Sequence, residues 1–298
     1  MTSSFAEDTI SLPGVYYGSV AWSDYTGDGK PDLLLTGSNN SFNPISKLYK
    51  NTGSGLSEDT SISLPGVDYG SVAWSDYNGD GKPDLLLTGY DNSFNPISKL
   101  YKNTGSGFIG DTSISLPGVS GSSVAWSDYT GDGKPDFLLT GNTGSGRISK
   151  LYKNTGSGFS EDTSISLPGV GYSSVAWSDY TGDGKPDLLL TGLDNSWNPI
   201  SKLYKNTGSG FSEDTSISLP GVAEGSVAWS DYTGDGKPDL LLTGLDNSNN
   251  RISKLYKNTG SGFSEDTSIS LPGVADGSVA WSDYTGDSQP DFLLTGFR

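Results

Sequence analysis

The chain has 298 residues, with 18 Lys and Arg against 35 Asp and Glu, so its formal net charge is −17. Such acidity argues against binding to nucleic acid, because the phosphates would be repelled. The chain holds no Cys, which excludes disulfides and thiolate ligands, and no His, which removes the commonest general base and the commonest transition-metal ligand.

The chain starts MTSSFAE, without the basic and apolar segments of a secretory signal, and no apolar run approaches the length of a membrane span. We therefore expect no membrane span, and it stays open whether a signal peptide was removed before residue 1. Residues 5–12, FAEDTISL, are expected to form a strand at the outer edge of a repeated unit.

An internal repeat organises the rest of the chain. The same acidic run begins, at spacings of 52, 52, 51, 52 and 52 residues, at Asp24, Asp76, Asp128, Asp179, Asp231 and Asp283. A period near 50 residues is typical of stacked or circular repeat folds. Because dividing such a chain would sever a continuous core, residues 1–298 are predicted to form one domain of six repeats.

One interior unit contains four segments with strand patterns. Residues 57–64 are rich in Ser, Thr and Ile, and residues 71–77 place Val72 and Trp74 on one face. Residues 85–88 are an apolar run that suits a strand covered on both faces, and residues 97–103, ISKLYKN, form the fourth segment. Gly and Pro recur too often for long helices, with 42 and 15 residues.

Four short strands per unit, repeated around a ring, are typical of a β-propeller, whereas one rung of a linear solenoid would not hold four antiparallel strands. The expected fold is all-β: a six-bladed β-propeller of four-stranded antiparallel blades, closed by the N-terminal strand. ISKLYKN occurs only five times, so the last blade is expected to be incomplete. Three explanations stay open: a gapped or rearranged last blade, strand exchange with another chain, or a truncated chain.

The acidic run Asp24–Asp32 has the pattern of a calcium loop. Asp stands at the first, fifth and ninth places, Thr at the third, and Gly at the sixth, where a sharp bend is needed. Lys30, at the seventh place, offers its backbone carbonyl while its ammonium points to water. These are hard oxygen donors of the kind that Ca²⁺ prefers. The alternative is an ordinary turn, since the same residue types are common in turns.

Five to six Ca²⁺ ions are expected, and six would change the net charge from −17 to −17 + 12 = −5. Calcium binding should then be coupled to folding stability. The sixth copy has Ser288 and Gln289 where the others have Gly and Lys, so its site is expected to be weaker or empty. The candidate metal ligands are Asp24, Thr26, Asp28, Lys30, Asp32, Asp76, Asn78, Asp80, Lys82, Asp84, Asp128, Thr130, Asp132, Lys134, Asp136, Asp179, Thr181, Asp183, Lys185, Asp187, Asp231, Thr233, Asp235, Lys237, Asp239, Asp283, Thr285, Asp287, Gln289 and Asp291.

The run DYTGDGKPDLLLTG resembles the FG-GAP/VCBS repeats of integrin α-chain propellers, over essentially the whole chain. The resemblance implies a propeller with Ca²⁺ in the loop between the first and second strands of each blade, and it favours an extracellular location. Integrin propellers have seven blades, whereas this chain has six units. In repeat type the chain is also similar to fungal integrin-like lectins, which bind N-acetylglucosamine-type sugars.

The copies differ mainly in two loops that should share one face of the disc. An aromatic ring flanked by Asn and Asp suits a sugar, because the ring covers C–H groups and the amides meet hydroxyls. The candidate ligand-binding residues are Tyr17, Phe42, Asn43, Tyr69, Phe94, Asn95, Tyr172, Trp197 and Asn198. Packing against a neighbouring loop is the alternative for Trp197. The six Trp of the inner strands are expected to pack between blades.

The function expected first is a calcium-binding, non-enzymatic carbohydrate-binding module, or lectin, with several weak sites that act together. Its partners would be glycans. The alternatives are a propeller that binds a surface protein in adhesion and an engineered repeat scaffold without a natural ligand. An enzyme is not expected, because the recurrent acids are committed to metal and catalysis usually needs one asymmetric site.

Overall fold

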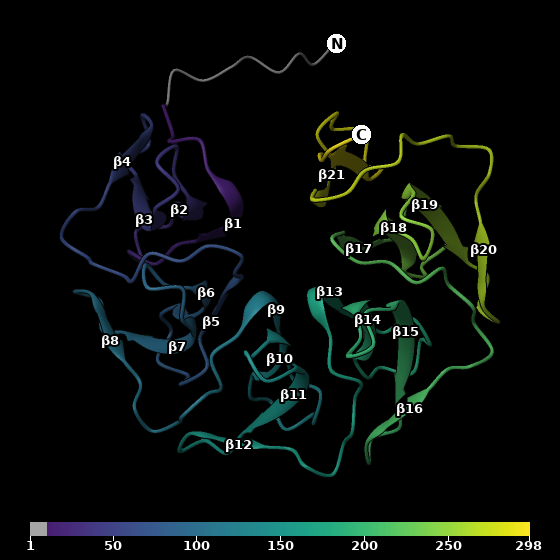
Figure 1. Ribbon diagram of the computed structural model, residues 1–298, viewed down its shortest axis with the longest axis horizontal. Coiled ribbons are helices and arrows are strands. Elements are labelled where there is room, and N and C mark those ends of the chain that lie inside the picture. The colour runs from purple at the N-terminus through teal and green to yellow at the C-terminus, as the bar shows by residue number, and fades with distance from the viewer. Residues whose placement is uncertain (1–10) are drawn as a thin grey trace.

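The computed structural model describes residues 11–298, which form five four-stranded antiparallel sheets and one two-stranded sheet, and no helix. The six sheets are arranged around an open ring (Figure 1). With no helix among these residues, there is none that could span a membrane. The expected N-terminal strand lies outside the described residues except for Ser11 and Leu12, which belong to no strand.

The strands of each sheet follow one another in chain order from the centre of the ring to its rim (Figure 1). The first strands are β1 (Tyr16–Ser23), β5 (Val72–Ser75), β9 (Ser120–Ser127), β13 (Gly171–Ser178), β17 (Val227–Ser230) and β21 (Val279–Ser282). The second strands are β2 (Asp32–Ser38), β6 (Asp84–Tyr90), β10 (Asp136–Asn142), β14 (Asp187–Leu193), β18 (Asp239–Leu245) and β22 (Asp291–Leu294).

The third strands are β3 (Pro44–Asn51), β7 (Pro96–Asn103), β11 (Arg147–Asn154), β15 (Pro199–Asn206) and β19 (Arg251–Asn258). The fourth are β4 (Leu56–Glu58), β8 (Phe108–Gly110), β12 (Phe159–Glu161), β16 (Phe211–Glu213) and β20 (Phe263–Glu265). Within residues 11–298, β21 and β22 form a sheet by themselves, so the incomplete last unit expected from the sequence is confirmed for this part of the chain.

The strand expected over residues 57–64 is wrong in extent. Only Leu56–Glu58 is a strand, and it pairs with β3 of the preceding unit. The chain turns at Asp59, whose Oδ1 accepts hydrogen bonds from the backbone N–H of Ser61 at 3.1 Å and from the Ser61 hydroxyl at 2.5 Å. An Asp side chain that bonds the backbone two residues ahead competes with strand pairing, and here it ends the strand.

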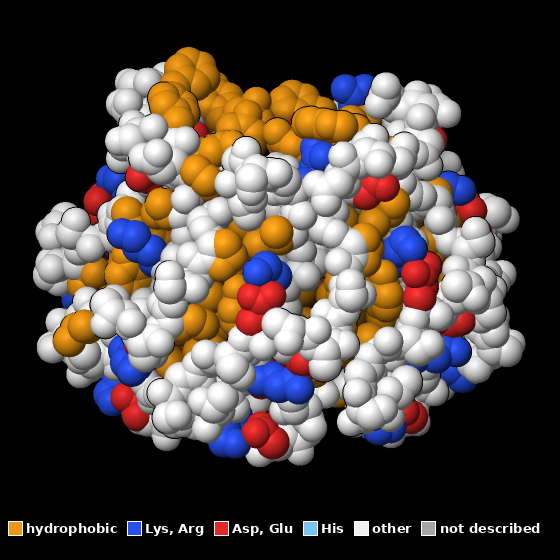
Figure 2. Space-filling model, turned by 60° about the horizontal axis from the view of Figure 1, so that its bottom comes forward, with side chains coloured by type: hydrophobic (Ala, Val, Ile, Leu, Met, Phe, Trp, Pro, Cys, Tyr) orange, Lys and Arg blue, Asp and Glu red, His pale blue; other side chains and the backbone are white. Residues whose placement is uncertain are grey.

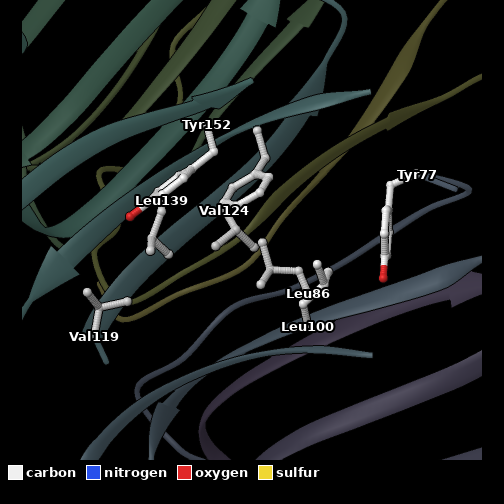
Figure 3. Close-up of a cluster of buried hydrophobic side chains, with 8 residues drawn as sticks. Tyr77, Leu86, Leu100, Val119, Val124, Leu139 and Tyr152 are labelled. Atoms are coloured by element: carbon white, nitrogen blue, oxygen red, sulfur yellow. The ribbon is translucent and has the colours of Figure 1, made fainter. Parts of the chain in front are cut away.

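The core lies between neighbouring sheets, because the second strands are covered on both faces. Figure 3 shows one such cluster, in which Leu86 and Leu100 of one sheet meet Val124, Leu139 and Tyr152 of the next. Close backbone approach completes each junction: a Cβ on Gly66 would lie 2.1 Å from the carbonyl oxygen of Pro44. Only Gly fits at that point.

The packing predicted for the inner-strand Trp is confirmed at five of the six positions. Trp74 lies parallel to Tyr25 of the preceding sheet, with ring centroids 6.2 Å apart. The same stack recurs in the pairs Trp126–Tyr77, Trp177–Tyr129, Trp229–Tyr180 and Trp281–Tyr232. Trp22, on β1 beside the opening of the ring, is instead 56% exposed.

Candidate functional site

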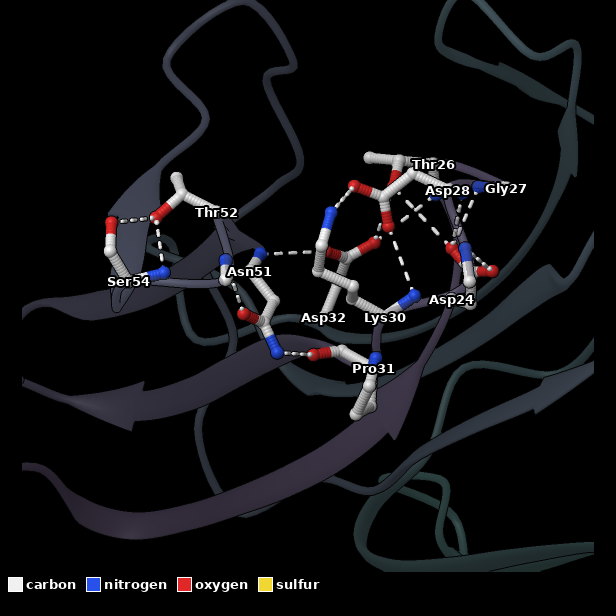
Figure 4. A network of polar contacts seen from close by, with 12 residues as sticks. Asp24, Thr26, Gly27, Asp28, Lys30, Pro31, Asp32, Asn51, Thr52 and Ser54 are labelled. Atoms are coloured by element: carbon white, nitrogen blue, oxygen red, sulfur yellow. Dashed lines mark hydrogen bonds and ion pairs between the residues drawn. The ribbon is translucent and has the colours of Figure 1, made fainter.

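The acidic loop joins the first strand of each sheet to the second, and Figure 4 shows the first copy. The Asp24 carboxylate accepts backbone hydrogen bonds from Gly27, Asp28 and Gly29 at 2.8, 3.0 and 2.8 Å. Gly29 has a φ of 85°, so the sixth place does need the left-handed conformation that Gly tolerates. The sixth copy bends in the same way, with Ser288 at a φ of 67°.

The Lys at the seventh place of the loop forms an ion pair with the Asp at the fifth place. Lys30 Nζ is 2.8 Å from an Asp28 carboxylate oxygen, and this contact recurs in the next four copies. Hydrogen bonds from Lys30 hold the pKa of Asp28 below its ordinary value. The Lys30 side chain is exposed to water, as expected, but its ammonium also contacts the carboxylate of its own loop, which was not expected.

The ninth-place Asp is buried and ties the loop to the third strand. In the first copy, one oxygen of Asp32 accepts from the backbone N–H and hydroxyl of Thr26, at 3.1 and 3.0 Å. The other accepts from the backbone N–H of Asn51 at 2.8 Å (Figure 4). The ninth place thus fixes how the loop sits on its sheet.

The second copy differs because Asn78 replaces Thr. Asp84 Oδ1 accepts from the backbone N–H of Asn103 at 2.8 Å and from Asn78 Nδ2 at 3.3 Å. Asp84 Oδ2 is buried and has no hydrogen-bond partner among the described residues. Burial raises the pKa of Asp84 to about 6. A buried oxygen without a partner suits a cation ligand, since a cation would compensate its desolvation.

The donors therefore fit a hard cation in their chemistry: three carboxylates, a hydroxyl or amide, and backbone carbonyls. Across residues 11–298, however, no three acidic side chains lie close enough together to hold a metal ion. Calcium binding by these loops stays a prediction.

The loop after the second strand presents an aromatic side chain in three copies. In the second copy, Asp91 Oδ1 accepts from the backbone N–H groups of Ser93 and Asn95 at 2.8 and 3.0 Å. Phe94 sits between them in the left-handed conformation, with a φ of 58°, and is 77% exposed. Phe42 and Trp197 repeat this arrangement, with φ values of 57° and 64°. The conformation costs about 1 kcal/mol for a bulky residue.

Two of these aromatic rings also touch a neighbour. Phe42 stacks on Tyr16, with centroids 5.8 Å apart. The Arg147 guanidinium lies 3.7 Å from the Trp197 ring centroid, and the Arg147 backbone N–H donates to Asn195 Oδ1 at 2.8 Å. Trp197 is both exposed and in contact with the preceding repeat. No local sequence pattern singles out Arg147 for this role, although it stands where three other copies have Pro44, Pro96 and Pro199; the fifth copy has Arg251.

The three predicted tyrosines occupy one place in the repeat, at the start of the first strand in β1 and β13 and just before β5. Tyr17, Tyr69 and Tyr172 all have positive φ, at 51°, 46° and 49°. The Tyr69 backbone N–H donates to the Tyr17 carbonyl at 2.9 Å, and the two rings stack with centroids 3.9 Å apart. Tyr16 pairs with Ser38 at the end of β2, so this turn and the aromatic loop share one face of the disc, as expected.

The asparagines that follow the aromatic rings are Asn43, Asn95 and Asn198. Asn198 Nδ2 donates to Asp194 Oδ2 at 3.3 Å, so this amide is partly engaged within its own loop.

Figure 2 shows hydrophobic side chains gathered along the upper edge of that view, while many charged side chains on the outer wall lie next to an opposite charge. One such ion pair joins Lys47 to Glu58 at 2.8 Å.

Repeated antiparallel sheets around a ring, each carrying the same acidic loop, define a β-propeller-type repeat protein. The sequence model of the FG-GAP-like repeat matches five times, at residues 24–87, 76–139, 128–190, 179–242 and 231–294. The chain therefore belongs to the FG-GAP-like repeat family.

Solved structures with a similar fold include two fungal lectins. One is an Agrocybe aegerita lectin described as recognising non-reducing terminal N-acetylglucosamine: TM-score 0.64, 18% identity, 94% of this chain and 74% of the lectin covered. The other is a variant of the Aleuria aurantia lectin in complex with α-methyl-L-fucoside: TM-score 0.53, 10% identity, 95% and 89% covered.

A curated relative is the T-cell immunomodulatory protein of Mus musculus, 26% identical over 253 residues. The match covers 76% of this chain but only 39% of that relative.

Proposed function

We propose that this protein is a non-enzymatic lectin whose repeated sites lie on the aromatic loops. The observation that carries the proposal is the left-handed, exposed aromatic residue at one place of three loops: Phe42, Phe94 and Trp197. Each ring keeps most of its surface exposed, even where it touches a neighbour, and an exposed aromatic ring held on a fixed loop suits a ligand. The lectin fold of the similar solved structures supports the same conclusion.

The chemistry of each site follows from its residues. A pyranose places its C–H face on the aromatic ring, and the adjacent Asn and Asp groups meet its hydroxyls. Three such loops on one rigid molecule give several weak contacts at once, so a surface that carries many glycans is held more tightly than a single sugar. The tyrosines at the inner turns would extend the contact on the same face.

The proposal also covers the sixth sheet and the acidic loops. The sheet β21–β22 counts as the sixth blade, because its first strand continues the spacing of the other five. Calcium would occupy the acidic loops and hold each first strand to its second, at some distance from the sugar. The expected closure of the ring by residues 5–12 falls mostly on residues outside those described, and the described residues leave the ring open between β1 and β21.

A glycan array tests the function. In the presence of Ca²⁺ we expect binding to a defined glycan class, reduced about tenfold or more in a Phe94→Ala, Trp197→Ala double variant. Ile109→Ala is the matched control, since Ile109 is also exposed but lies on β8, in a fourth strand at the rim. Failure of the unaltered protein to bind any glycan would overturn the lectin proposal. A second array with chelator shows whether recognition depends on the acidic loops.

A further inference from the structure

The junctions between neighbouring sheets use one set of polar contacts. At four of them a Val on the first strand donates its backbone N–H to a Ser hydroxyl of the preceding sheet; Val124 and Ser71, 3.3 Å apart, are one example. Trp74 donates its Nε1–H to the carbonyl of Ala21 at 3.4 Å, and Trp177 donates to that of Ala125 at 3.3 Å. These contacts lie beside the apolar clusters between the sheets.

The sheet β1–β4 carries one half of such a junction at the opening of the ring. Val20 is 59% exposed, whereas Val72, at the same place in the next repeat, is 7% exposed. Trp22 is exposed in the same way. We call these two residues on β1 the head face.

The sheet β21–β22 carries the other half. Leu293 is 66% exposed, whereas Leu34, at the same place in the first repeat, is fully buried. Ser278 and Ala280 stand at the places whose hydroxyl and carbonyl accept hydrogen bonds in the other junctions. We call Ser278, Ala280 and Leu293 the tail face. The two faces match residue by residue: Val20 with Ser278, and Trp22 with Ala280.

We propose that the head face of one molecule binds the tail face of a second copy of this chain. The contact would repeat the junction that the molecule already makes between its own sheets. A second copy fits better than contact within one molecule, because the successive sheets, stacked through one repeated contact, leave the ring open (Figure 1). Because the two faces differ, the contact is heterologous, and further copies can add in the same direction.

Light scattering during gel filtration tests the proposal on the full 298-residue chain. We expect the mean mass to rise with concentration to at least twice the monomer mass. Val20→Glu and Leu293→Glu should each be monomeric, since each places a negative charge on one face, and the two altered faces would repel each other. Mixed in equal amounts, they should form a dimer and nothing larger, because the intact tail of the first binds the intact head of the second.

Ile109→Lys is the matched control: it places a charge on an exposed residue of β8, away from both faces, and should assemble like the unaltered protein. Unchanged far-ultraviolet circular dichroism shows that each variant is folded. A monomer at every concentration would indicate closure within one chain and overturn the proposal. Assembly that survives in both single variants, or a mixture that stays monomeric, would overturn it as well.

Discussion

At the scale of single residues, two copies of the acidic loop differ by one hydrogen-bond donor. Thr26 satisfies the buried ninth-place oxygen of its own loop, whereas Asn78 leaves Asp84 Oδ2 without a partner in the described residues. Desolvation disfavours the charged form of this carboxylate, so burial raises the pKa of Asp84 to about 6. Near-identical repeats thus differ in how well they stabilise the charged form of the ninth-place Asp.

The first prediction compares the same substitution in these two loops. In chelator at pH 7.5, Asp84→Asn should raise the free energy of unfolding by about 2 kcal/mol, because it removes a buried charge. Asp32→Asn should lower it by about 1–3 kcal/mol, because an amide N–H would face a donor from Thr26 or Asn51. Urea unfolding measures both. Equal effects in the two loops would contradict the difference that we describe.

The pH dependence of Asp84 has a definite sign. Its pKa in the folded protein lies above the ordinary value of 3.8, so the folded state binds the proton more tightly. The stabilising effect of Asp84→Asn should therefore be largest above about pH 6 and disappear near pH 4. If the effect persisted at pH 4, charge would not be its cause.

At the residue scale, sequence patterns predict some features of the candidate sites and miss others. The spacing of the acids and their repetition are plain in the sequence, and so are the aromatic residues between Asn and Asp. The left-handed backbone at Phe94 depends on Asp91 bonding two N–H groups, which composition does not reveal. The contact of Arg147 with Trp197 joins residues 50 positions apart in sequence, so no local pattern predicts it.

At the scale of elements, the segment after each fourth strand connects one sheet to the next. In the second repeat, Asp111 accepts a hydrogen bond from the Tyr77 hydroxyl at 2.7 Å and lies 3.2 Å from Lys102 Nζ. Burial alone would raise the pKa of Asp111, but hydrogen bonds from Ser113, Tyr77 and Lys102 outweigh it and lower the pKa to about 2. Equivalent Asp residues in the other connectors are shifted in the same direction.

The second prediction concerns acid. An Asp with a lowered pKa stabilises the fold above its ordinary pKa of 3.8, and this stabilisation is lost as the pH falls toward about 2. The free energy of unfolding should therefore drop steeply between pH 4 and 2. Tyr77→Phe should cost about 1 kcal/mol at neutral pH and raise the pKa of Asp111, measured by NMR.

Tyr101→Phe is the matched control, because Tyr101 is partly buried and its pKa is raised by burial and not by a carboxylate. An unchanged Asp111 pKa in Tyr77→Phe would contradict the coupling.

These connectors were also the least predictable elements. Their Ser, Thr and Ile residues favour a strand over residues 57–64, whereas the Asp59–Ser61 hydrogen bonds end the strand at Glu58.

At the scale of the whole molecule, the main strand contacts between sheets in residues 11–298 join successive repeats, so each acidic loop should act independently. The third prediction follows from this. Isothermal titration should give a stoichiometry of five to six Ca²⁺, and Asp128→Asn should lower it by one. A stoichiometry below four would contradict the metal prediction, and loss of all sites in Asp128→Asn would contradict independence.

The all-β class and the repetition of four-stranded sheets could be predicted from the spacing of the acidic runs and the short apolar strands. The incomplete last unit could be predicted as well, from the count of ISKLYKN, but the open ring could not. The opening lies between the first and the last sheet, which are far apart in sequence, so no local residue pattern reports it. Val20 and Leu293 are exposed at this opening, whereas residues at the same places in the interior repeats are buried.

The aromatic loop keeps its shape without the aromatic residue. In the fifth repeat Asn249 occupies the same place with a φ of 58°, and Asp246 makes the same two backbone hydrogen bonds, at 2.7 and 2.9 Å. The scaffold of this loop is thus separate from the side chain that it displays. Mutation can exchange that one side chain in one repeat and leave the other repeats as they are. Under the proposed lectin function, a single molecule could in this way acquire different sugar preferences on one face of the disc without any change in how it folds.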